Sequence, residues 1–166
     1  MITREAALEE LKRHQPDHYQ YQHALYSEAI MSALAPRFGA DPEAWGLCGL
    51  LHDIDFPLTK NDPAQHGLKA KELLSGLAGL TDEILHAIMA HNSEHTGVEP
   101  SSDLDYALRC AETVTGMISA APLMRPTGME GMEPKSTKKK MQDKAFAAAS
   151  SRETIRRLEK ICLPLD

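Results

Sequence analysis

The chain has 166 residues, of which 42% are hydrophobic and 25% are charged, and its formal net charge at pH 7 is −6. A chain of this length can build one domain with a substantial core, and its acidic balance argues against general binding to nucleic acids. No apolar run reaches the length of a membrane span, and the N-terminus lacks the apolar segment of a signal peptide. We therefore expect a single cytoplasmic domain over residues 1–166, with no membrane partner.

The apolar residues follow a helical period and no alternating strand pattern persists, so we expect an all-α fold. The first two helices are predicted over residues 4–14 and 18–35. On the second helix, His23 shares a face with Tyr26 and Ile30, which indicates that this face points toward the core. An inward-pointing histidine can be a hydrogen-bonded core residue or a metal ligand, and periodicity alone does not distinguish the two.

The next predicted helix ends in an adjacent histidine and aspartate, His52 and Asp53. Asp41 can cap the start of this helix, and Pro42 suits its first position. The helix is apolar on nearly every face, so we predict that it is buried and that the imidazole and carboxylate lie where it leaves the core. A divalent metal ion would bind both groups. The alternative is a histidine favoured by the helix dipole beside a solvated aspartate.

Three more histidines lie on the next two predicted helices. His66 lies in the first turn of one helix, where either a neutral metal ligand or an exposed loop residue is expected. His91 lies on the apolar stripe of the second helix, and His86 lies on the opposite side, where we expect it to be exposed and without function. The two helices are predicted over residues 64–75 and 81–92, after an irregular loop over residues 54–63.

A longer helix is predicted over residues 102–121, with an apolar face and a polar face. Glu112 lies on the polar face together with Asp105, so periodicity alone predicts that Glu112 is exposed. After a loop rich in proline and glycine, a run of lysines begins at Lys135, and a last helix is predicted over residues 151–162. The lysine run can be a solvated surface or an anion-binding segment.

The three cysteines do not suggest a covalent or metal-binding role. Cys48, Cys110 and Cys162 are far apart, odd in number and mostly at apolar positions of the helical period. This pattern is typical of reduced packing residues in a cytosolic protein. It matches neither a disulfide framework nor a CxxC metal site.

In chain order the sequence presents a histidine, a His-Asp pair, two further histidines and an acid, each on a separate predicted helix. This pattern resembles the HD superfamily of metal-dependent phosphohydrolases, whose pattern is H…HD…D with extra histidines in the two-metal members. The segment from Leu50 to Asp55 matches the LLHDI-type core of that family, and the segment from Cys110 to Gly116 is similar to its A-D-x-x-T-G segment. The tail over residues 135–153 is similar to that of a small bacterial branch of the HDIG type.

The resemblance implies an all-α bundle of about six to eight helices with a metal site between the core helices. It implies a core at about residues 18–121 and a C-terminal helical extension at about residues 134–162. The implied cofactors are one or two divalent ions drawn from Mn, Fe, Co, Ni, Zn and Mg, and the ligand types do not choose among them.

The resemblance also assigns metal ligands to positions of this chain. Where the family has its last metal-binding aspartate, this chain has Glu112, whose carboxylate is carried on a longer side chain. Glu112 would complete the first site or leave that coordination position to water, and Asp105 on the same face is an alternative ligand. The other implied ligands are His23, His52 and Asp53 for a first ion and Asp53, His66 and His91 for a second.

The implied activity is hydrolysis of a small phosphate ester such as a nucleotide by metal-activated water, with Asp53 accepting the proton of that water. The expected partner is thus a small phosphorylated metabolite, whose phosphate lysine and arginine side chains would neutralise. Two alternatives stay open, a non-catalytic sensor that binds a nucleotide or a metal and a di-iron oxygenase of the same fold. The sequence identifies neither the substrate nor the oligomeric state, for which a homodimer is one option. The candidate phosphate-binding residues are Lys60, Arg125, Lys135, Lys138 and Lys139.

Overall fold

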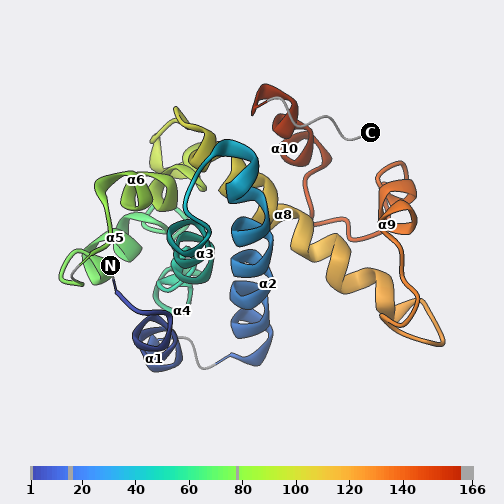
Figure 1. The fold of residues 1–166 in the computed structure, drawn as a ribbon, viewed down its shortest axis with the longest axis horizontal. Coiled ribbons are helices and arrows are strands. Elements are labelled where there is room, and N and C mark those ends of the chain that lie inside the picture. The colour runs from blue at the N-terminus through green and yellow to red at the C-terminus, as the bar shows by residue number, and fades with distance from the viewer. Residues whose placement is uncertain (1, 15–16, 78, 162–166) are drawn as a thin grey trace.

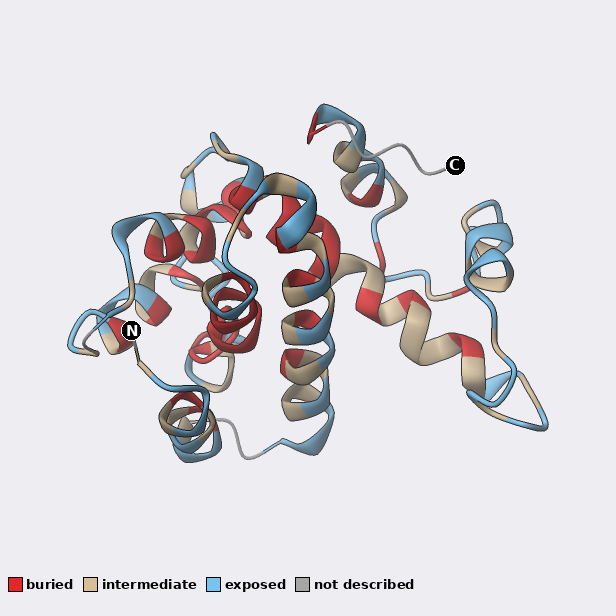
Figure 2. Ribbon diagram, in the orientation of Figure 1, coloured by how far each residue is buried: buried red, intermediate tan, exposed pale blue. Residues whose placement is uncertain are grey.

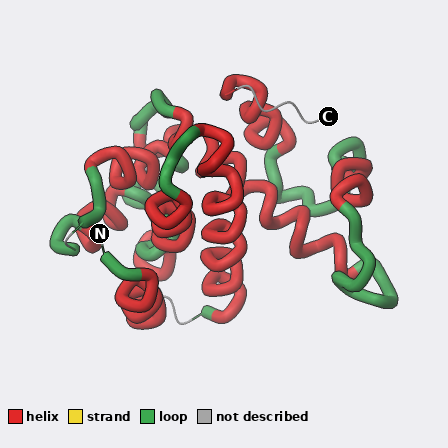
Figure 3. Tube along the Cα trace, viewed as in Figure 1, coloured by secondary structure: helices red, strands yellow, loops and turns green. Residues whose placement is uncertain are grey.

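The fold is entirely helical in the part of the chain that the structure describes. A computed structural model covers residues 2–14, 17–77 and 79–161, and all regular elements in these ranges are helices (Figure 3). The predicted all-α fold is therefore confirmed. In chain order the elements are α1 (Arg4–His14), α2 (His18–Leu34), the 3₁₀ helix η1 (Ala35–Phe38), α3 (Pro42–Leu51), α4 (Phe56–Thr59), α5 (Leu68–Leu74), α6 (Asp82–Ala90), α7 (Ser93–Thr96), α8 (Asp103–Leu123), α9 (Pro134–Lys140), α10 (Arg152–Arg156) and the 3₁₀ helix η2 (Arg157–Ile161).

Local sequence signals determine where several helices begin. The Asp41 carboxylate accepts a hydrogen bond from the Glu43 amide at 3.0 Å, and Pro42 is the first residue of α3. Thr81 caps α6 in a similar way, and Ser102 forms a capping box at the start of α8. These bonds satisfy amide groups of the first turn that have no partner inside the helix, so the helices begin where the caps predict.

The central element of the bundle is α3, which is buried from Trp45 to Leu51 (Figures 1 and 2). It packs against α1, α2 and α6, and one apolar cluster runs through these elements. Gly49 allows α2 to approach closely, because a Cβ atom there would lie only 2.7 Å from the carbonyl oxygen of Ser27. The end of α3 therefore brings the residues that follow it, His52 and Asp53, into the interior of the protein.

Two of the three cysteines are buried packing residues, as predicted. Cys48 and Cys110 are both buried and free of disulfide bonds. Burial raises the pKa of both thiols, to about 12 for Cys110, so neither forms a thiolate near neutral pH. Cys162 lies outside the described residues.

The 21-residue helix α8 belongs to two parts of the molecule. Its first half packs against α2 and α6, whereas its second half projects from the bundle toward α9 (Figure 1). A second, smaller apolar cluster forms there around Met117 and Phe146. We refer to residues 117–149 as the arm. The expected division into a core over residues 18–121 and an extension over residues 134–162 stays a prediction.

The helices differ from the predicted ones mainly in short segments. The single-turn helix α4 lies inside the region predicted as an irregular loop, and α7 directly follows the end of α6, so there are more helices than expected. The last predicted helix is divided, since α10 ends at Arg156 and the chain continues as a tighter 3₁₀ turn. None of the described helices has the length and apolar character needed to cross a bilayer.

Candidate metal centre

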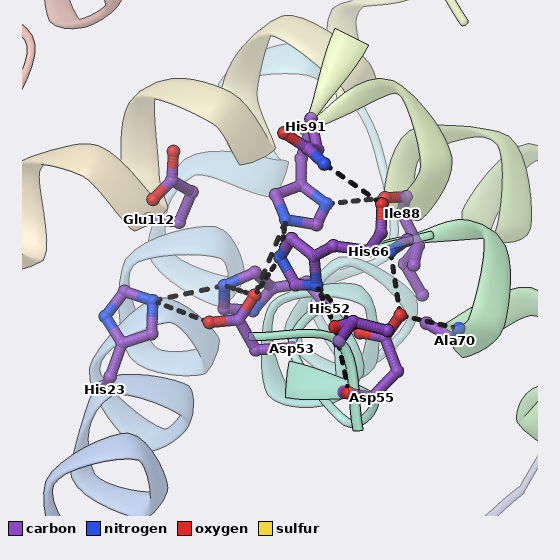
Figure 4. Close-up of polar contacts among 12 residues, drawn as sticks. His23, His52, Asp53, Asp55, His66, Ala70, Ile88, His91 and Glu112 are labelled. Atoms are coloured by element: carbon purple, nitrogen blue, oxygen red, sulfur yellow. Dashed lines mark hydrogen bonds and ion pairs between the residues drawn. The ribbon is translucent and has the colours of Figure 1, made fainter. Parts of the chain in front are cut away.

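Five side chains from four separate segments of the chain converge beside the buried end of α3 (Figure 4). They come from α2, from the turn after α3, from the segment before α5 and from the end of α6. Their possible ligand atoms form two groups, each with all atoms within 4.8 Å of one another, and Asp53 belongs to both groups. The groups are His23, His52 and Asp53, and Asp53, His66 and His91. The structure thus brings together the two triplets that the family resemblance implies.

The Asp53 carboxylate lies between two pairs of imidazoles. The Nε2 atoms of His23 and His52 are 3.1 Å apart, and those of His66 and His91 are 3.0 Å apart. Oδ1 of Asp53 lies 3.2 Å from His66 Nε2, and Oδ2 lies 3.5 Å from His23 Nε2. One carboxylate therefore contacts both pairs and can bridge two ions.

Hydrogen bonds on the outer side of two rings determine where their lone pairs point. A backbone carbonyl oxygen only accepts, so His52 Nδ1 donates to the Gly49 carbonyl at 2.7 Å. For the same reason His91 Nδ1 donates to the Ile88 carbonyl. A neutral imidazole carries one N–H, so Nε2 of each of these rings is left as an acceptor that faces the centre of the site.

Side chains orient the other two rings in the same way. Thr115 donates its hydroxyl hydrogen to the Glu112 carbonyl, so the Thr115 oxygen accepts a hydrogen bond from His23 Nδ1 at 2.7 Å. The Asp55 carboxylate accepts one from His66 Nδ1 at 3.0 Å. All four rings, when neutral, therefore present an Nε2 lone pair to the centre of the site.

This arrangement fits bound cations. Two acceptor nitrogens 3.1 Å apart, and two others 3.0 Å apart, repel each other unless a proton or a metal ion lies between them. A divalent ion would remove that repulsion and would also compensate the buried charge of Asp53. The donor set of imidazole nitrogens and carboxylate oxygens therefore fits one or two divalent ions.

Burial and charge act on these groups in opposite directions. Burial lowers the pKa of His52 to about 3 and also lowers the pKa of His23, so both rings are neutral. Burial alone would lower the pKa of His66, but the Asp53 and Asp55 carboxylates raise it to about 10. Burial opposes the charge on Asp53, but the neighbouring imidazoles hold the pKa of that carboxyl well below its usual range. Without a metal ion, the second group therefore carries a proton on His66.

Asp55 is part of the candidate site, and the sequence pattern did not single it out. It is fully buried, and besides His66 it accepts hydrogen bonds from the Gly67 amide at 2.8 Å and from the Ala70 amide at 3.0 Å. It thereby holds His66 and the first turn of α5 in one arrangement. Its position two residues after Asp53 was the signal that could have identified it. An acid so close to the end of a buried helix needs hydrogen-bond donors around its carboxylate.

Comparison with known proteins identifies the family. The HD domain family matches residues 21–144, a range that contains all five converging side chains. The chain belongs to the HD-domain family. This domain indicates the superfamily of metal-dependent phosphohydrolases. A curated relative, Ribonuclease Y of Cutibacterium acnes, is 28% identical over 109 residues, which are 65% of this chain and 19% of the relative, so the chain spans only a small part of that protein's length. No solved structure gives a significant match.

In this HD domain, the acid that departs from the family pattern does not join the cluster of ligand atoms. Glu112 lies on α8 beside the cluster, and its carboxylate accepts a hydrogen bond from the Thr113 hydroxyl (Figure 4). Among the described residues it belongs to neither ligand group. Burial raises its pKa to about 7, and the charge of Asp53 acts in the same direction. The periodicity-based prediction of an exposed Glu112 is wrong, because the side chain is partly buried where α8 packs on the bundle.

The alternative ligand Asp105 lies outside both ligand groups. Its Oδ2 accepts hydrogen bonds from the amides of Ser101 at 2.8 Å and Ser102 at 3.0 Å, so Asp105 caps the start of α8. The same oxygen lies 3.1 Å from His86 Nδ1. The His86 side chain is 38% exposed, so it is turned largely outward as predicted, but its ring also contacts Asp105 where α6 packs against α8. That His86 has no function stays a prediction.

A cavity of about 500 Å³ opens beside the ligand cluster and is lined by His23 and Asp53. The rest of its wall comes from the first turn of α2, from the segment over residues 91–95, from α8, and from residues 149–151 and Thr154. Asn92 and His95 contribute polar groups, which contact each other at 2.8 Å. A substrate group of moderate size therefore has room next to the cluster.

The cations predicted to bind phosphate are not among the residues that line this cavity. The lysines of α9 line a separate pocket against α8 and α10. Arg125 donates a hydrogen bond to the Glu130 carbonyl at 2.8 Å within the turn after α8, and Lys60 is exposed at the end of α4. The residues concerned are Lys60, Arg125, Lys135, Lys138 and Lys139. Nothing in this arrangement supports a phosphate-binding role for them, because α9 belongs to the arm and packs against α8, away from the imidazole cluster.

Proposed function

We propose that this HD domain hydrolyses a small phosphate ester with the help of one or two divalent ions. The observation that carries the proposal is the pairing of four Nε2 lone pairs around the shared carboxylate of Asp53. The cavity beside that carboxylate leaves space for the phosphate. The HD domain supports the same reaction class, because its superfamily is one of metal-dependent phosphohydrolases.

Each residue of the site has a separate role in this proposal. His23, His52 and Asp53 would hold one ion, and Asp53 would share a second ion with the other imidazole pair. A bound divalent ion supplies a water molecule of lowered pKa and polarises a phosphoryl oxygen. The Asp53 carboxylate would accept a proton from a water molecule held there, because its two oxygens contact imidazoles of both groups. Thr115 keeps the His23 ring oriented through its hydrogen bond to Nδ1.

A small ester is a better substrate than an RNA chain for this domain. The name of the relative, Ribonuclease Y, describes a protein of which this chain matches only 19%, so that activity does not transfer with the likeness. The chain carries a formal net charge of −6, which repels a phosphate polymer. A single phosphate next to the imidazole cluster avoids most of that repulsion.

Metal content and phosphate release test the proposal together. Protein expressed without a histidine tag should contain one or two divalent ions per chain by elemental mass spectrometry, and it should release phosphate from small monoesters. Asp53→Ala should lose the ions and at least about a hundred-fold of the activity, because metal-activated water then has no site. His18→Ala, at an exposed position at the start of α2, is the matched histidine control and should match the wild type. Full metal occupancy in Asp53→Ala would refute the assignment.

A non-catalytic sensor is the second candidate, and one observation favours it. The carboxylate of Glu112 is bonded to Thr113 and lies outside both ligand groups, so the first site has one fewer protein ligand than the family pattern. Tight binding of a nucleotide without product would support the sensor. Iron-dependent oxygen uptake would instead support the oxygenase alternative.

A further inference from the structure

Large apolar side chains that remain exposed gather along one groove. Tyr19 and Tyr26 extend from α2, whereas Leu123 ends α8 and Met129 lies in the turn that follows. Together they line a groove of about 610 Å³ between the two helices. The prediction that Tyr26 faces the core is wrong, because it is 41% exposed beside the projecting half of α8. A concentrated apolar surface of this kind is typical of a binding site.

The groove contains no aspartate, glutamate, lysine or arginine among the described residues that line it. Its polar groups are the Gln22 amide, the Ser119 hydroxyl, the tyrosine hydroxyls and the His23 ring. A charged ligand body would lose its hydration here without gaining a partner of opposite charge. An apolar body would be removed from water against apolar walls, which is favourable.

The groove is continuous with the candidate metal centre. Tyr19, His23 and Gly116 line both the groove and the cavity beside the ligand cluster. The His23 ring lies at the boundary, since its Nε2 is 3.5 Å from Asp53 Oδ2. Gly116 also lies there, and a Cβ atom at this position would come within 2.4 Å of the Ser150 hydroxyl. A glycine therefore lets Ser150 approach α8 without a side chain entering the junction.

We infer that this groove binds the alcohol part of the phosphate ester, and that this part is an apolar, uncharged aryl or alkyl group. The inference rests on the proposed hydrolysis for the ester linkage, but the preference for an apolar body follows from the groove itself. A molecule with its phosphate beside Asp53 has its ester oxygen near His23, and the groove begins at that ring. The groove is therefore a specificity surface for the leaving group.

A pair of substrates with one phosphate each tests the preference. Wild-type enzyme should hydrolyse 1-naphthyl phosphate at least tenfold more efficiently, as kcat/KM, than glycerol 3-phosphate. Because naphthol is the better leaving group in every variant, the groove is tested by the change in this ratio, which should fall at least fivefold in Leu123→Asp and in Tyr26→Ala, mainly through a higher KM for the naphthyl ester. Leu123 is 88% exposed, so its replacement leaves the fold intact, as thermal unfolding would verify.

Leu58 supplies the matched control. It is a leucine of α4, 63% exposed and not among the residues lining the groove, so Leu58→Asp should leave the substrate ratio unchanged. A wild-type enzyme without preference for the naphthyl ester would overturn the inference, as would an equal fall of the ratio in both aspartate variants.

Binding of the product alcohol separates this inference from the proposed reaction. 1-Naphthol fluorescence should report binding to the wild type and at least tenfold weaker binding to Leu123→Asp. That result supports the groove even where no ester is hydrolysed, and the proposed function alone then fails. Light scattering tests the competing occupant, a second copy of the chain. A wild-type dimer that Leu123→Asp dissociates, with naphthol binding unchanged, would overturn the inference and make the groove an interface.

Discussion

The bundle around α3 and the arm over residues 117–149 differ in which side chains they bury and which they expose. In the bundle, polar groups are buried and each imidazole of the cluster has an oriented partner on its outer nitrogen. In the arm, apolar side chains such as Leu123 and Met129 are exposed, and the lysines of α9 face solvent or an open pocket (Figure 2). Burial therefore holds the ligand groups of the bundle in place, whereas the sparse packing of the arm leaves apolar surface free to bind other molecules.

The helix α8 combines a buried part and an exposed part in one element. The part of α8 that precedes the arm carries buried Leu108 and Ala111 and contributes Thr115 to the orientation of His23. The part within the arm ends in Leu123, which is almost fully exposed. A change in the part that precedes the arm should therefore alter metal binding, and a change in the part within the arm should alter only what binds beside it.

The largest effect in the bundle should come from Asp55→Ala. The substitution leaves the Gly67 and Ala70 amides without their acceptor and frees the His66 ring. We expect a loss of roughly 2–4 kcal/mol in the free energy of unfolding, together with loss of the ion held by the second group. Denaturant unfolding and elemental analysis measure the two effects. Asp55→Asn keeps one acceptor oxygen and should lose less, and unchanged stability in Asp55→Ala would contradict the comparison.

Thr115→Val should have a smaller, site-specific effect. The variant keeps the shape of the side chain but removes the oxygen that accepts from His23 Nδ1. Loss of such an orienting partner should weaken binding of the first ion by roughly 10- to 100-fold. Isothermal titration with Mn²⁺ would measure it, with Thr115→Ser as the control that retains the hydroxyl. Equal affinities in the two variants would show that the ring is positioned by packing alone.

Proton release should accompany binding of the second ion. The pKa of His66 is raised to about 10 without a metal, so a proton must leave before its Nε2 can ligate. The raised pKa stabilises the metal-free fold fully below the unfolded pKa of about 6.5, and this contribution is lost as the pH rises toward 10. Metal affinity should therefore increase by up to about tenfold per pH unit between about pH 6 and 8. Titrations in two buffers of different ionisation enthalpy count the protons, and identical heats would refute the prediction.

The smallest effect should come from the arm. Lys138→Glu combined with Lys139→Glu should leave metal content and phosphate release within about twofold of wild type, because neither side chain lines the cavity of the ligand cluster. The free energy of unfolding should change by no more than about 0.5 kcal/mol, as it does for most surface substitutions. A large loss of phosphate release would restore the role that the sequence pattern suggested for these lysines.

The family pattern predicted more of the site than periodicity did. Periodicity located the inward face of His23 and the stripe of His91, but it placed Glu112 and Tyr26 on the wrong sides. Periodicity describes one helix at a time, and the exposure of these residues depends on how far α8 diverges from α2. The pattern of histidines and acids predicts contacts between different helices, because these residue types can bind the same metal ion when the fold brings them together.

Most helix starts, their caps and the identity of the converging histidines could be predicted from the sequence alone. Those signals are local, since a cap at Asp41 or Thr81 acts on amides no more than three residues away. Two features became evident only from the packing of the helices: Thr115 orients His23, a residue 92 positions earlier, and Asp55 joins His66 to the start of α5. The packing also keeps the lysines of α9 out of the cavity beside the ligand cluster and leaves an apolar groove between α2 and α8. These outcomes depend on the packing of whole helices, because burial and hydrogen-bond partners across such distances exist only after the bundle has formed.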